Sequence, residues 1–322
     1  MYLYLFLVVA ILIALFVWYK LADADLTLLW CSKFRRANFK KYAGRVVWIT
    51  GASSGIGEEV AYAFSRLGAR LAISGTRRDA LERVRAECLK RKALDVLCIP
   101  FDVTDCESHE KMLATVLQSY KRLDVLVNNA GRLQRAQFIS STVDVEKQLF
   151  DVNVFGSINI CRVVVKHWLL MNQSFAQLFL TSSASGKMGS PFSAAYAGSK
   201  HAVHGYLESL RNELCIIGSK IQITIGCPGP VRSNIRANAL TNKKGERYKK
   251  EDAVSERKLM DTSRCAELIV SGVANSLDEL WIAEQPLLAL YYVYQYFPST
   301  FRRYLIKFIM TKEQIEKFRK EG

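Results

Sequence analysis

The stretch that decides the fold reads Val46-Val47-Trp48-Ile49-Thr50-Gly51-Ala52-Ser53-Ser54-Gly55-Ile56-Gly57. Its apolar first half is typical of a buried strand, and a helical pattern begins at Glu58, after the glycines. Glycines between a strand and a helix allow a tight turn, a close backbone approach to a pyrophosphate and close helix packing. The helix N-terminus adds free N–H groups and a positive dipole end, which favour phosphate. A glycine-rich turn in this position therefore predicts a dinucleotide-binding loop.

Short apolar runs of strand length recur along the chain, separated by stretches with helical periodicity. They occupy residues 46–50, 71–74, 96–100, 125–127, 178–181 and 221–226, and residues 280–282 are a candidate for one more. Buried strands that alternate with helices are typical of a parallel sheet covered on both faces. We therefore predict an α/β fold, a doubly wound parallel sheet of Rossmann type with about seven strands, in one catalytic domain over residues 44–282.

Composition excludes several classes of protein. The chain has 322 residues, is 50% hydrophobic and carries a net charge of +15, so bulk disorder is excluded. Basic clusters lie at residues 33–45, 243–250 and 302–322, but no zinc-finger or RNP-type motif accompanies them. We therefore expect attraction to anionic membrane lipids and no nucleic-acid partner. The eight cysteines form no C-x-x-C pair and the four histidines are scattered, which predicts free thiols and no metal site.

The first 19 residues contain no charged side chain and are long enough to cross a bilayer as a helix. We predict a transmembrane or signal-anchor helix over residues 1–19, followed by a basic linker over residues 20–43. Two other interpretations stay open: a cleaved signal peptide, because Ala22-Asp23-Ala24 resembles a cleavage site, and a buried core helix. Basic residues only after the span predict a cytosolic catalytic domain. The sequon Asn172-Gln173-Ser174 would suit a luminal domain instead.

The C-terminal segment, residues 283–322, is apolar and aromatic at first and basic at its end. Residues 285–297 are nearly uncharged, and residues 301–308 mix aromatic side chains with arginine and lysine. One interpretation is a helix that closes over the domain core. The other is an interfacial segment that enters the membrane beside the active site. The sequence supports both equally.

Tyr196 and Lys200 stand four residues apart, which places both on one face of a helix. A lysine ammonium beside a phenol favours the phenolate and lowers the pKa of the tyrosine. Tyr196 can then give a proton to a carbonyl oxygen or take one from an alcohol. Ser183, just beyond a predicted strand, can hydrogen-bond the same oxygen, and Ser182 is the alternative. Two histidines that follow on this helix are interpreted as ordinary packing or surface residues: His201 and His204.

The end of the second strand distinguishes NAD from NADP in this type of fold. An acidic residue there binds the ribose 2′-hydroxyl, whereas a basic one accommodates a 2′-phosphate. This chain has Gly75-Thr76-Arg77-Arg78, with no acidic residue before Asp79. We therefore predict NADP(H) as the cofactor, with Arg77 as the main phosphate partner. Arg78 is either a second partner or a solvated residue of the next helix.

Several motifs, in the right order, resemble the short-chain dehydrogenase/reductase family over residues 44–282. Its T-G-x-x-x-G-x-G motif matches residues 50–57, its N-N-A-G motif matches residues 128–131, and its Y-x-x-x-K motif matches residues 196–200. The resemblance implies a catalytic tetrad made of Asn153, Ser183, Tyr196 and Lys200. It also implies cofactor contacts at Thr50, Gly51, Ser53, Ser54, Gly55, Ile56, Gly57, Thr76, Arg77, Asp102, Val103, Asn129, Ala130, Gly131, Tyr196, Lys200, Pro228, Gly229, Val231 and Ser233.

The family implies a role for each tetrad residue: acid/base chemistry for Tyr196, ribose binding and tuning of Tyr196 for Lys200, polarisation of the carbonyl for Ser183, and a water-holding relay for Asn153. Among the cofactor contacts, it assigns the adenine to Asp102 and the nicotinamide to the turn Pro228-Gly229-Pro230-Val231 and to Ser233. Ser233 stands where the family usually has threonine, and either hydroxyl can bond the carboxamide.

More narrowly, the chain resembles the membrane-bound member 7 branch of these dehydrogenase/reductases and, less closely, 11-beta-hydroxysteroid dehydrogenase. The resemblance rests on the apolar N-terminus, on Leu81-Glu82-Arg83-Val84 and on Trp281-Ile282-Ala283-Glu284-Gln285-Pro286 with the tyrosine-rich stretch after it. Thr76 departs from that branch, which has arginine there, and this departure weakens the prediction of NADP(H).

The resemblance and the anchor together predict an NADP(H)-dependent oxidoreductase that interconverts lipophilic carbonyls and alcohols, such as steroids, retinoids and apolar ketones or aldehydes. We expect a location at the endoplasmic reticulum membrane, membrane lipids as partners, and a homodimer formed through the helices before and within the Tyr196 segment. Residues 232–255 are expected to act as a substrate lid. Two alternatives stay open: a ketone reductase of lipid synthesis, of the ketosphingoid type, and a catalytically silent cofactor-binding scaffold.

Overall fold

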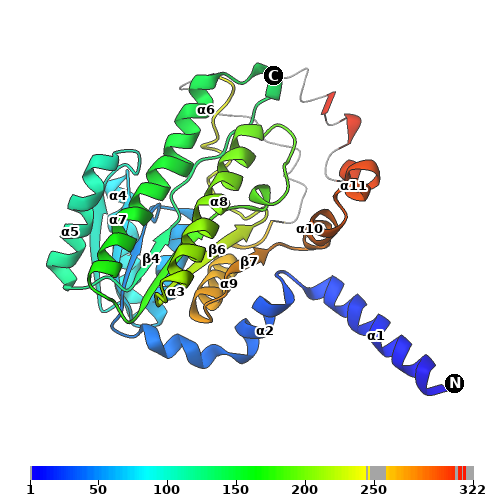
Figure 1. Ribbon diagram of the computed structural model, residues 1–322, viewed down its shortest axis with the longest axis horizontal. Coiled ribbons are helices and arrows are strands. Elements are labelled where there is room, and N and C mark those ends of the chain that lie inside the picture. Colours follow the sequence, from blue (N-terminus) through cyan, green and yellow to red (C-terminus); the bar gives the residue numbers. More distant parts are fainter. Residues whose placement is uncertain (1, 244–245, 247–258, 309–310, 314, 317–322) are drawn as a thin grey trace.

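Seven parallel strands form one sheet at the centre of the computed structural model (Figure 1), which describes residues 2–243, 246, 259–308, 311–313 and 315–316. The strands lie in the order β3-β2-β1-β4-β5-β6-β7, so the chain winds outward from β1 in both directions. Their bounds are β1 Val46–Ile49, β2 Arg70–Gly75, β3 Asp95–Pro100, β4 Val125–Asn128, β5 Ala176–Thr181, β6 Ile221–Pro228 and β7 Glu279–Ile282. The predicted doubly wound sheet is confirmed, and residues 280–282 belong to its seventh strand.

Helices cover both faces of the sheet. They are α3 (Gly55–Arg66), α4 (Arg78–Lys90) and α9 (Thr262–Ala274) on one face, and α5 (His109–Tyr120), α7 (Ser157–Leu170) and α8 (Ala194–Ile216) on the other. In β1, Val47 and Ile49 pack on the first face, whereas Val46 and Trp48 pack on the second, and all four are fully buried. Successive strand residues point to opposite faces, so a strand buried on both faces must be continuously apolar.

The connection from α6 (Val143–Phe150) to α7 is a π-helical turn, Asp151–Gly156. The combined helical stretch Val143–Leu170 is long and apolar enough to cross a membrane, but 56% of its most apolar window is buried. It is therefore a core helix of the domain. Short 3₁₀ turns complete the connections at Cys106–Ser108, Phe138–Ser140 and Ala184–Gly186.

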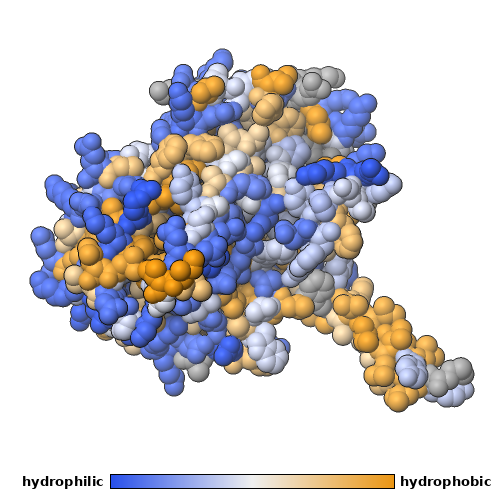
Figure 2. Space-filling model, viewed as in Figure 1, coloured by the Kyte–Doolittle hydropathy of each residue, from blue (hydrophilic) through white to orange (hydrophobic). Residues whose placement is uncertain are grey.

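The N-terminal helix α1 (Tyr2–Leu21) extends away from the domain (Figure 1), and Figure 2 shows it as an apolar rod. Its most apolar window has a mean hydropathy of 2.5, and none of that window is buried. A helix of this length and composition can cross a bilayer.

Residues 22–43, which we expected to form a basic linker, pack onto the domain instead. The helix α2 (Leu26–Phe34) buries Leu28 and Cys31, and the 3₁₀ helix η1 (Arg36–Tyr42) buries Tyr42. The Tyr42 hydroxyl donates to Gln177 Oε1 at 2.7 Å, within the sheet. The linker was predicted from the basic residues of this segment. In α2, however, the single basic side chain, Lys33, is exposed, while Leu28 and Cys31, three residues apart, are buried.

The C-terminal elements form a small apolar layer against the domain. They are α10 (Leu287–Tyr296), α11 (Pro298–Thr300), the π-helical turn η7 (Phe301–Leu305) and the 3₁₀ turn η8 (Ile306–Phe308). Leu288, Tyr291 and Phe301 are buried there, together with Ala22 from the end of α1 and Met188 from the loop after β5. This arrangement agrees with the interpretation of a helix that closes over the domain.

Two glycines in helix interiors test this packing, because one has room for a methyl group and the other has none. A Cβ at Gly272 in α9 would lie 2.3 Å from Leu280 of β7, which is fully buried, whereas a Cβ at Gly205 in α8 meets nothing within 4 Å. We expect Gly272→Ala to lower the free energy of unfolding by about 1–3 kcal/mol through overpacking. Gly205→Ala should raise it by about 0.5–1 kcal/mol through lower chain entropy.

Thermal or denaturant unfolding in detergent micelles, with both variants measured beside the wild type, checks this prediction. Equal effects of the two substitutions would show that α9 does not pack on β7 as described.

Candidate active site

A cavity of about 890 Å³ opens at the carboxyl ends of the strands. Ligands of open parallel sheets bind at this edge. The cavity is lined by every predicted cofactor contact except Gly57, and by Ser183, Tyr196 and Lys200 of the predicted tetrad. The fold therefore brings the glycine loop and the catalytic residues, far apart in sequence, into one space.

The glycine loop after β1 has a conformation that only glycine adopts without strain. Gly51 and Gly55 have φ values of +63° and +62°. A Cβ at Gly57 would lie 2.4 Å from the carbonyl oxygen of Gly51. Gly57 thus stands behind the cavity wall, where it lets α3 contact the loop, and does not line the space for a ligand.

The Thr50 side chain joins the ends of β1 and β4. Its hydroxyl donates to Asn128 Oδ1 at 3.1 Å and accepts from the backbone N–H groups of Asn129 and Ala130 at 3.0 and 3.1 Å. Thr181, at the end of β5, donates to Asn129 Oδ1 at 3.0 Å. These bonds hold three neighbouring strand ends together under the cavity floor.

Tyr196, Ser183 and Lys200 converge at the inner wall of the cavity. Tyr196 and Lys200 lie in the first turns of α8, on one face, and Ser183 follows β5 directly. The Ser183 side chain lies close enough to the Tyr196 hydroxyl to lower the pKa of the tyrosine. Lys200 Nζ lies 5.9 Å from the centroid of the Tyr196 ring and donates to the Thr181 carbonyl at 2.8 Å. All three side chains are buried.

Comparison with known proteins assigns this arrangement to a family. A family model described as short chain dehydrogenase matches residues 45–244. The chain is 40% identical over 301 residues to dehydrogenase/reductase SDR family member 7 of Homo sapiens, which covers 92% of this chain and 87% of that protein. The chain belongs to the short-chain dehydrogenase family. The 11-beta-hydroxysteroid dehydrogenase-like 2 protein of Arabidopsis thaliana is 32% identical over 256 residues, 78% of this chain and 79% of that one.

Solved structures agree with this assignment. A short chain dehydrogenase/reductase from Burkholderia phymatum in complex with NAD has a TM-score of 0.69 and 26% identity, and covers 79% of this chain and 94% of that one. An alcohol dehydrogenase from Thermococcus sibiricus complexed with 5-hydroxy-NADP has a TM-score of 0.62 over 75% of this chain and 97% of that one. At 22% identity, the second likeness shows the shared fold alone.

In this short-chain dehydrogenase the choice between Ser182 and Ser183 is settled by what each hydroxyl meets. Both serines line the cavity. The Ser183 side chain interacts with Tyr196, whereas the Ser182 hydroxyl donates to the Lys200 carbonyl at 3.3 Å. Ser183 Oγ also accepts from the Ser185 backbone N–H at 3.1 Å, which fixes its orientation. Ser183 is therefore the hydroxyl placed to bond a substrate oxygen.

Asn153 lies one layer behind the cavity, in the π-helical turn between α6 and α7. Its Oδ1 accepts from the Arg132 backbone N–H at 2.8 Å, and its Nδ2 donates to the Arg132 carbonyl at 2.9 Å and to Ser199 Oγ at 3.0 Å. Asn153 thus fixes the backbone of the loop residue that follows Gly131, close to Lys200. π-Helical turns within helices occur frequently at functional sites.

The prediction that Lys200 lowers the pKa of Tyr196 is wrong in this structure. Burial raises the pKa of Tyr196 above its usual value, and the nearby Ser183 side chain offsets this only in part. Lys200 is itself buried, which lowers the pKa of its ammonium to about 8. Low dielectric surroundings disfavour every charged form, so burial outweighs the attraction that we expected between the two groups.

His204 is a buried residue behind the cavity, which agrees with its interpretation as a packing residue, and it also makes polar contacts. Its Nε2 lies 3.0 Å from Ser182 Oγ, which donates to the Lys200 carbonyl. Because a carbonyl only accepts, the Ser182 proton goes to Lys200, and His204 donates its Nε2–H to Ser182. His201, four residues from Ala197, lies at the surface and contacts only that turn's carbonyl.

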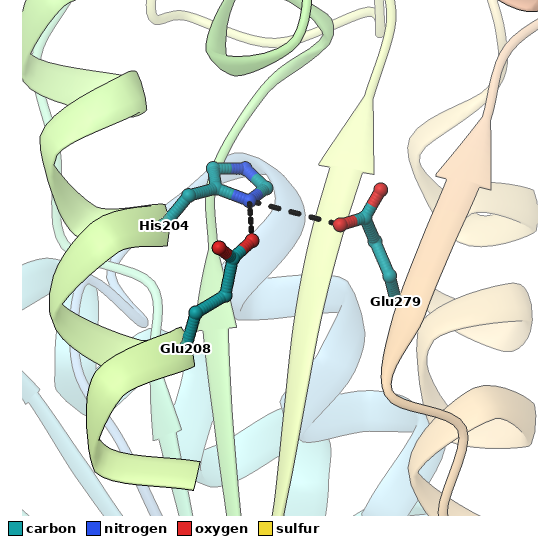
Figure 3. A group of neighbouring side chains, drawn as sticks. All are labelled: His204, Glu208 and Glu279. Atoms are coloured by element: carbon teal, nitrogen blue, oxygen red, sulfur yellow. Dashed lines mark ion pairs between the residues drawn. The ribbon is translucent and has the colours of Figure 1, made fainter. Parts of the chain in front are cut away.

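The other nitrogen of His204 faces two carboxylates, as Figure 3 shows. Nδ1 lies 3.8 Å from Glu208 Oε1 and 3.7 Å from Glu279 Oε2. The three groups are close enough to share a cation, although we expected no metal site. The Lys187 ammonium already lies 2.7 Å from Glu279 Oε2, so we interpret the group as a Lys187–Glu279 ion pair beside a neutral imidazole. Burial and the charge of Lys187 lower the pKa of His204 to about 4.

The apolar side of the cavity was missed by sequence reasoning. Met188, Leu287 and Tyr291 line it, and they come from the loop after β5 and from α10. The Tyr291 hydroxyl is buried and has no hydrogen-bond partner among the described residues. The only signal in the sequence was the aromatic run of residues 285–297, which suits a membrane surface equally well.

The buried lysine gives a testable pH dependence. With Tyr196 as the proton donor, as the family resemblance implies, reduction of a carbonyl requires its protonated form. The raised pKa of Tyr196 keeps it protonated through neutral and mildly alkaline pH. The charge on Lys200 is lost as the pH rises through about 8. We therefore expect kcat/KM for reduction to fall as the pH rises through about 8. In Lys200→Arg, whose guanidinium stays charged, the fall should move to higher pH.

The pH–rate profiles of the wild type and Lys200→Arg, measured at saturating NADPH, check this assignment. The same alkaline fall in both proteins would mean that another group controls it.

Proposed function

We propose that this protein is an NADP(H)-dependent oxidoreductase that interconverts lipophilic carbonyls and alcohols by hydride transfer with Tyr196 as the acid/base. The observation that carries the proposal is the convergence of Tyr196, Ser183 and Lys200 on the cavity that the glycine loop also lines. A silent scaffold would not need these three side chains to meet at one point.

The residues around the cavity fit a nicotinamide dinucleotide. The side chain of Ser54, the N-cap of α3, makes no capping hydrogen bond with a described residue, so the first N–H groups of α3 are left for a phosphate. A Cβ at Gly51 would lie 2.9 Å from Ala130 Cα, so bare backbone is required beside the pyrophosphate position. Asp102 and Val103 also line the cavity and, as the family resemblance implies, would hold the adenine, whereas Val231 and Ser233 would hold the nicotinamide.

The chemistry divides between the cofactor and the side chains. The bound nicotinamide supplies or accepts the hydride. Ser183 donates a hydrogen bond to the substrate oxygen, which orients and polarises the carbonyl. Tyr196 gives its proton to that oxygen during reduction and takes it back during oxidation. The ammonium of Lys200, held by the Thr181 carbonyl, stabilises the negative charge that develops on the tyrosine.

Basic and neutral side chains at the end of β2 support NADP(H) over NAD(H). Thr76 and Arg77 line the cavity, and no acidic residue lies at that strand end. Arg78 is not among the lining residues and begins α4, which favours its interpretation as a solvated residue. Arg77 is the cation placed to meet a 2′-phosphate.

A lipophilic substrate is supported by the apolar half of the cavity. Leu133, Met188, Ile235, Leu287 and Tyr291 line the side away from the glycine loop. A relative named 11-beta-hydroxysteroid dehydrogenase-like agrees with a steroid-sized apolar substrate. A fatty-chain ketone of lipid synthesis would also fit this lining. Of the expected lid, residues 232–255, only residues 232–243 and 246 are described, and the rest lies outside the described residues.

We also propose that α1 anchors the protein in the endoplasmic reticulum membrane with the catalytic domain in the cytosol. The length and exposure of α1, and the basic residues after it, support this arrangement. Asn172 of the sequon is exposed, so a glycan there would place the domain in the lumen instead. A homodimer is likewise a proposal, supported by the resemblance to relatives that pair through the long helices.

Cofactor choice is tested at Arg77, with Arg78 as the matched control. Losing a hydrogen bond to a charged group costs about 1.5–3 kcal/mol, so Arg77→Ala should raise KM for NADPH by about 10- to 100-fold. KM for NADH should not change, because NADH has no 2′-phosphate. Arg78→Ala should leave both constants near those of the wild type. An equal effect of Arg77→Ala on both cofactors would contradict the assignment.

The reaction itself is tested at Tyr196. Membranes with wild-type protein or Tyr196→Phe receive NADPH and a panel of steroid ketones, retinal, ketosphingoid bases and polar sugars, with products read by mass spectrometry. We expect a product from a lipophilic compound with the wild type and about 10²–10⁴-fold less with the variant. Unchanged NADPH binding in Tyr196→Phe is the control. Faster turnover of sugars than of every lipophilic compound would contradict the proposal that the substrate is lipophilic.

A further inference from the structure

Helix α2 exposes a stripe of large apolar side chains. Leu26, Trp30 and Phe34 are 59%, 60% and 60% exposed, and they stand four residues apart, on one face of the helix. The Trp30 and Phe34 rings are 4.4 Å apart and form one patch. The opposite face of α2 buries Leu28 and Cys31, so the helix has two apolar faces, one packed on the domain and one exposed.

The orientation of this stripe is fixed by the domain. Asp25 caps α2 through Leu28 N at 2.9 Å, and its other oxygen accepts from Trp281 N, in β7, at 3.0 Å. Asp23 forms a bidentate ion pair with Arg264 of α9, at 2.7 and 3.1 Å. The helix therefore cannot roll its outer stripe into the core, and the stripe must meet solvent or another partner.

The C-terminal layer continues this surface. Leu29 of α2 packs against the cluster formed by α10 and η7, so the two segments lie side by side. Both lie on the side of the domain from which α1 departs (Figure 1). We call the combined surface the docking face, and its large exposed side chains are Leu26, Trp30, Phe34, Tyr296, Phe297 and Tyr304.

Cations surround the docking face. Residues 26–57 contain no Asp or Glu. The exposed basic residues of this region are Lys33, Arg35, Arg36 and Lys40, and on the C-terminal side Arg302, Arg303 and Lys307. None of these seven forms an ion pair with a carboxylate in the described part of the chain. Aromatic and aliphatic side chains ringed by unpaired cations suit the headgroup level of an anionic bilayer.

We propose that the docking face lies in the interface of a bilayer that contains anionic phospholipid, with α2 in the membrane plane. The bilayer is the surface expected to cover the docking face, because only four residues separate α2 from the end of α1, a helix long and apolar enough to cross a bilayer. Charge complementarity agrees with it. A symmetric contact between two copies would instead bring two sets of unpaired cations together, which opposes association.

Docking would place the wall of the active site against lipid. Leu287 and Tyr291, in the first half of α10, line the cavity, while Tyr296 and Phe297 at its end belong to the docking face. One short helix thus separates the substrate space from the membrane surface. This last link rests on the proposed lipophilic substrate, whereas the docking itself does not.

Depth-resolved quenching of Trp30 tests the docking. Full-length protein is placed in nanodiscs of phosphatidylcholine and phosphatidylserine that carry bromine near the headgroup end or near the methyl end of the acyl chains. The Trp30 signal is the difference between the wild type and Trp30→Phe, which keeps the apolar face. An interfacial helix lies about 5–10 Å into the headgroup and acyl boundary, so shallow bromine should quench Trp30 several-fold more than deep bromine.

Two outcomes would overturn the proposal. Trp30 emission that neither bromine position quenches, with the maximum of a water-exposed indole, would leave the face in solvent. Unquenched emission with the maximum of a buried indole, in a particle holding two copies, would assign the face to a dimer. Replacing phosphatidylserine with phosphatidylcholine should weaken the shallow quenching if the cations contribute.

The link to catalysis is measured separately. Leu26→Ser/Trp30→Ser/Phe34→Ser in nanodiscs should raise KM several-fold for a membrane-soluble ketone and leave KM for a water-soluble ketone unchanged. The matched control is Leu89→Ser/Leu94→Ser, two exposed leucines beside β3 at the opposite edge of the sheet. If no ketone is reduced by the wild type, the proposed function fails while the quenching result still decides the docking. Equal rises for both ketones would refute the link.

Discussion

A side chain at Gly57 would lie 2.4 Å from the carbonyl oxygen of Gly51, and the active site depends on this close approach of α3 to the end of β1. Because no atom stands between them, the N-terminus of α3 points into the cavity with its first N–H groups free. Thr50 extends the same constraint sideways, since its hydroxyl holds the chain after β4, and Asn129 holds Thr181 in turn. Phosphate binding and catalysis therefore share one rigid floor.

Lys200, Ser182 and His204 are buried together and joined by hydrogen bonds. Lys200, only 4% exposed, donates to the Thr181 carbonyl, and Ser182 bonds the Lys200 backbone. His204 stands behind Ser182 and carries the network out to Glu279 and the surface. The charged form of Lys200 is costly in these surroundings, so burial lowers the pKa of its ammonium. The same low dielectric strengthens the effect of that ammonium on any negative charge that develops beside it.

The segment that follows α1 is joined to β7, the last strand of the sheet. Ala24 pairs with Ile282, and the Asp25 carboxylate binds the backbone of Trp281, so the end of α1 is fastened to the last strand. From that strand the chain leads directly into α10, which lines the cavity. If α1 is the anchor that we propose, this connection fixes the orientation of the domain at the membrane, whereas a flexible linker would leave it free.

Local patterns in the sequence determined the sheet, the glycine loop and the pairing of Tyr196 with Lys200. Each depends on residues close together in the chain: apolar runs define strands, glycines permit a turn, and a spacing of four residues defines one helix face. The family resemblance already favoured Ser183 over Ser182 for the tetrad. The structure adds what each hydroxyl meets: Ser183 lies beside Tyr196, and Ser182 donates to the Lys200 carbonyl.

The tertiary structure alone decided the remaining features, because they depend on burial and on contacts between distant segments. The pKa values of Tyr196 and Lys200 follow from how completely the fold excludes water from them, which no local pattern records. Residues 22–43 looked like a solvated linker by charge, yet Leu28 and Tyr42 find core partners over two hundred and one hundred residues away, in α9 and β5. The contact between His204 and Ser182 likewise joins two segments that are distant in the sequence. Spacing along a chain reports which residues share a face, and only packing reports what that face meets.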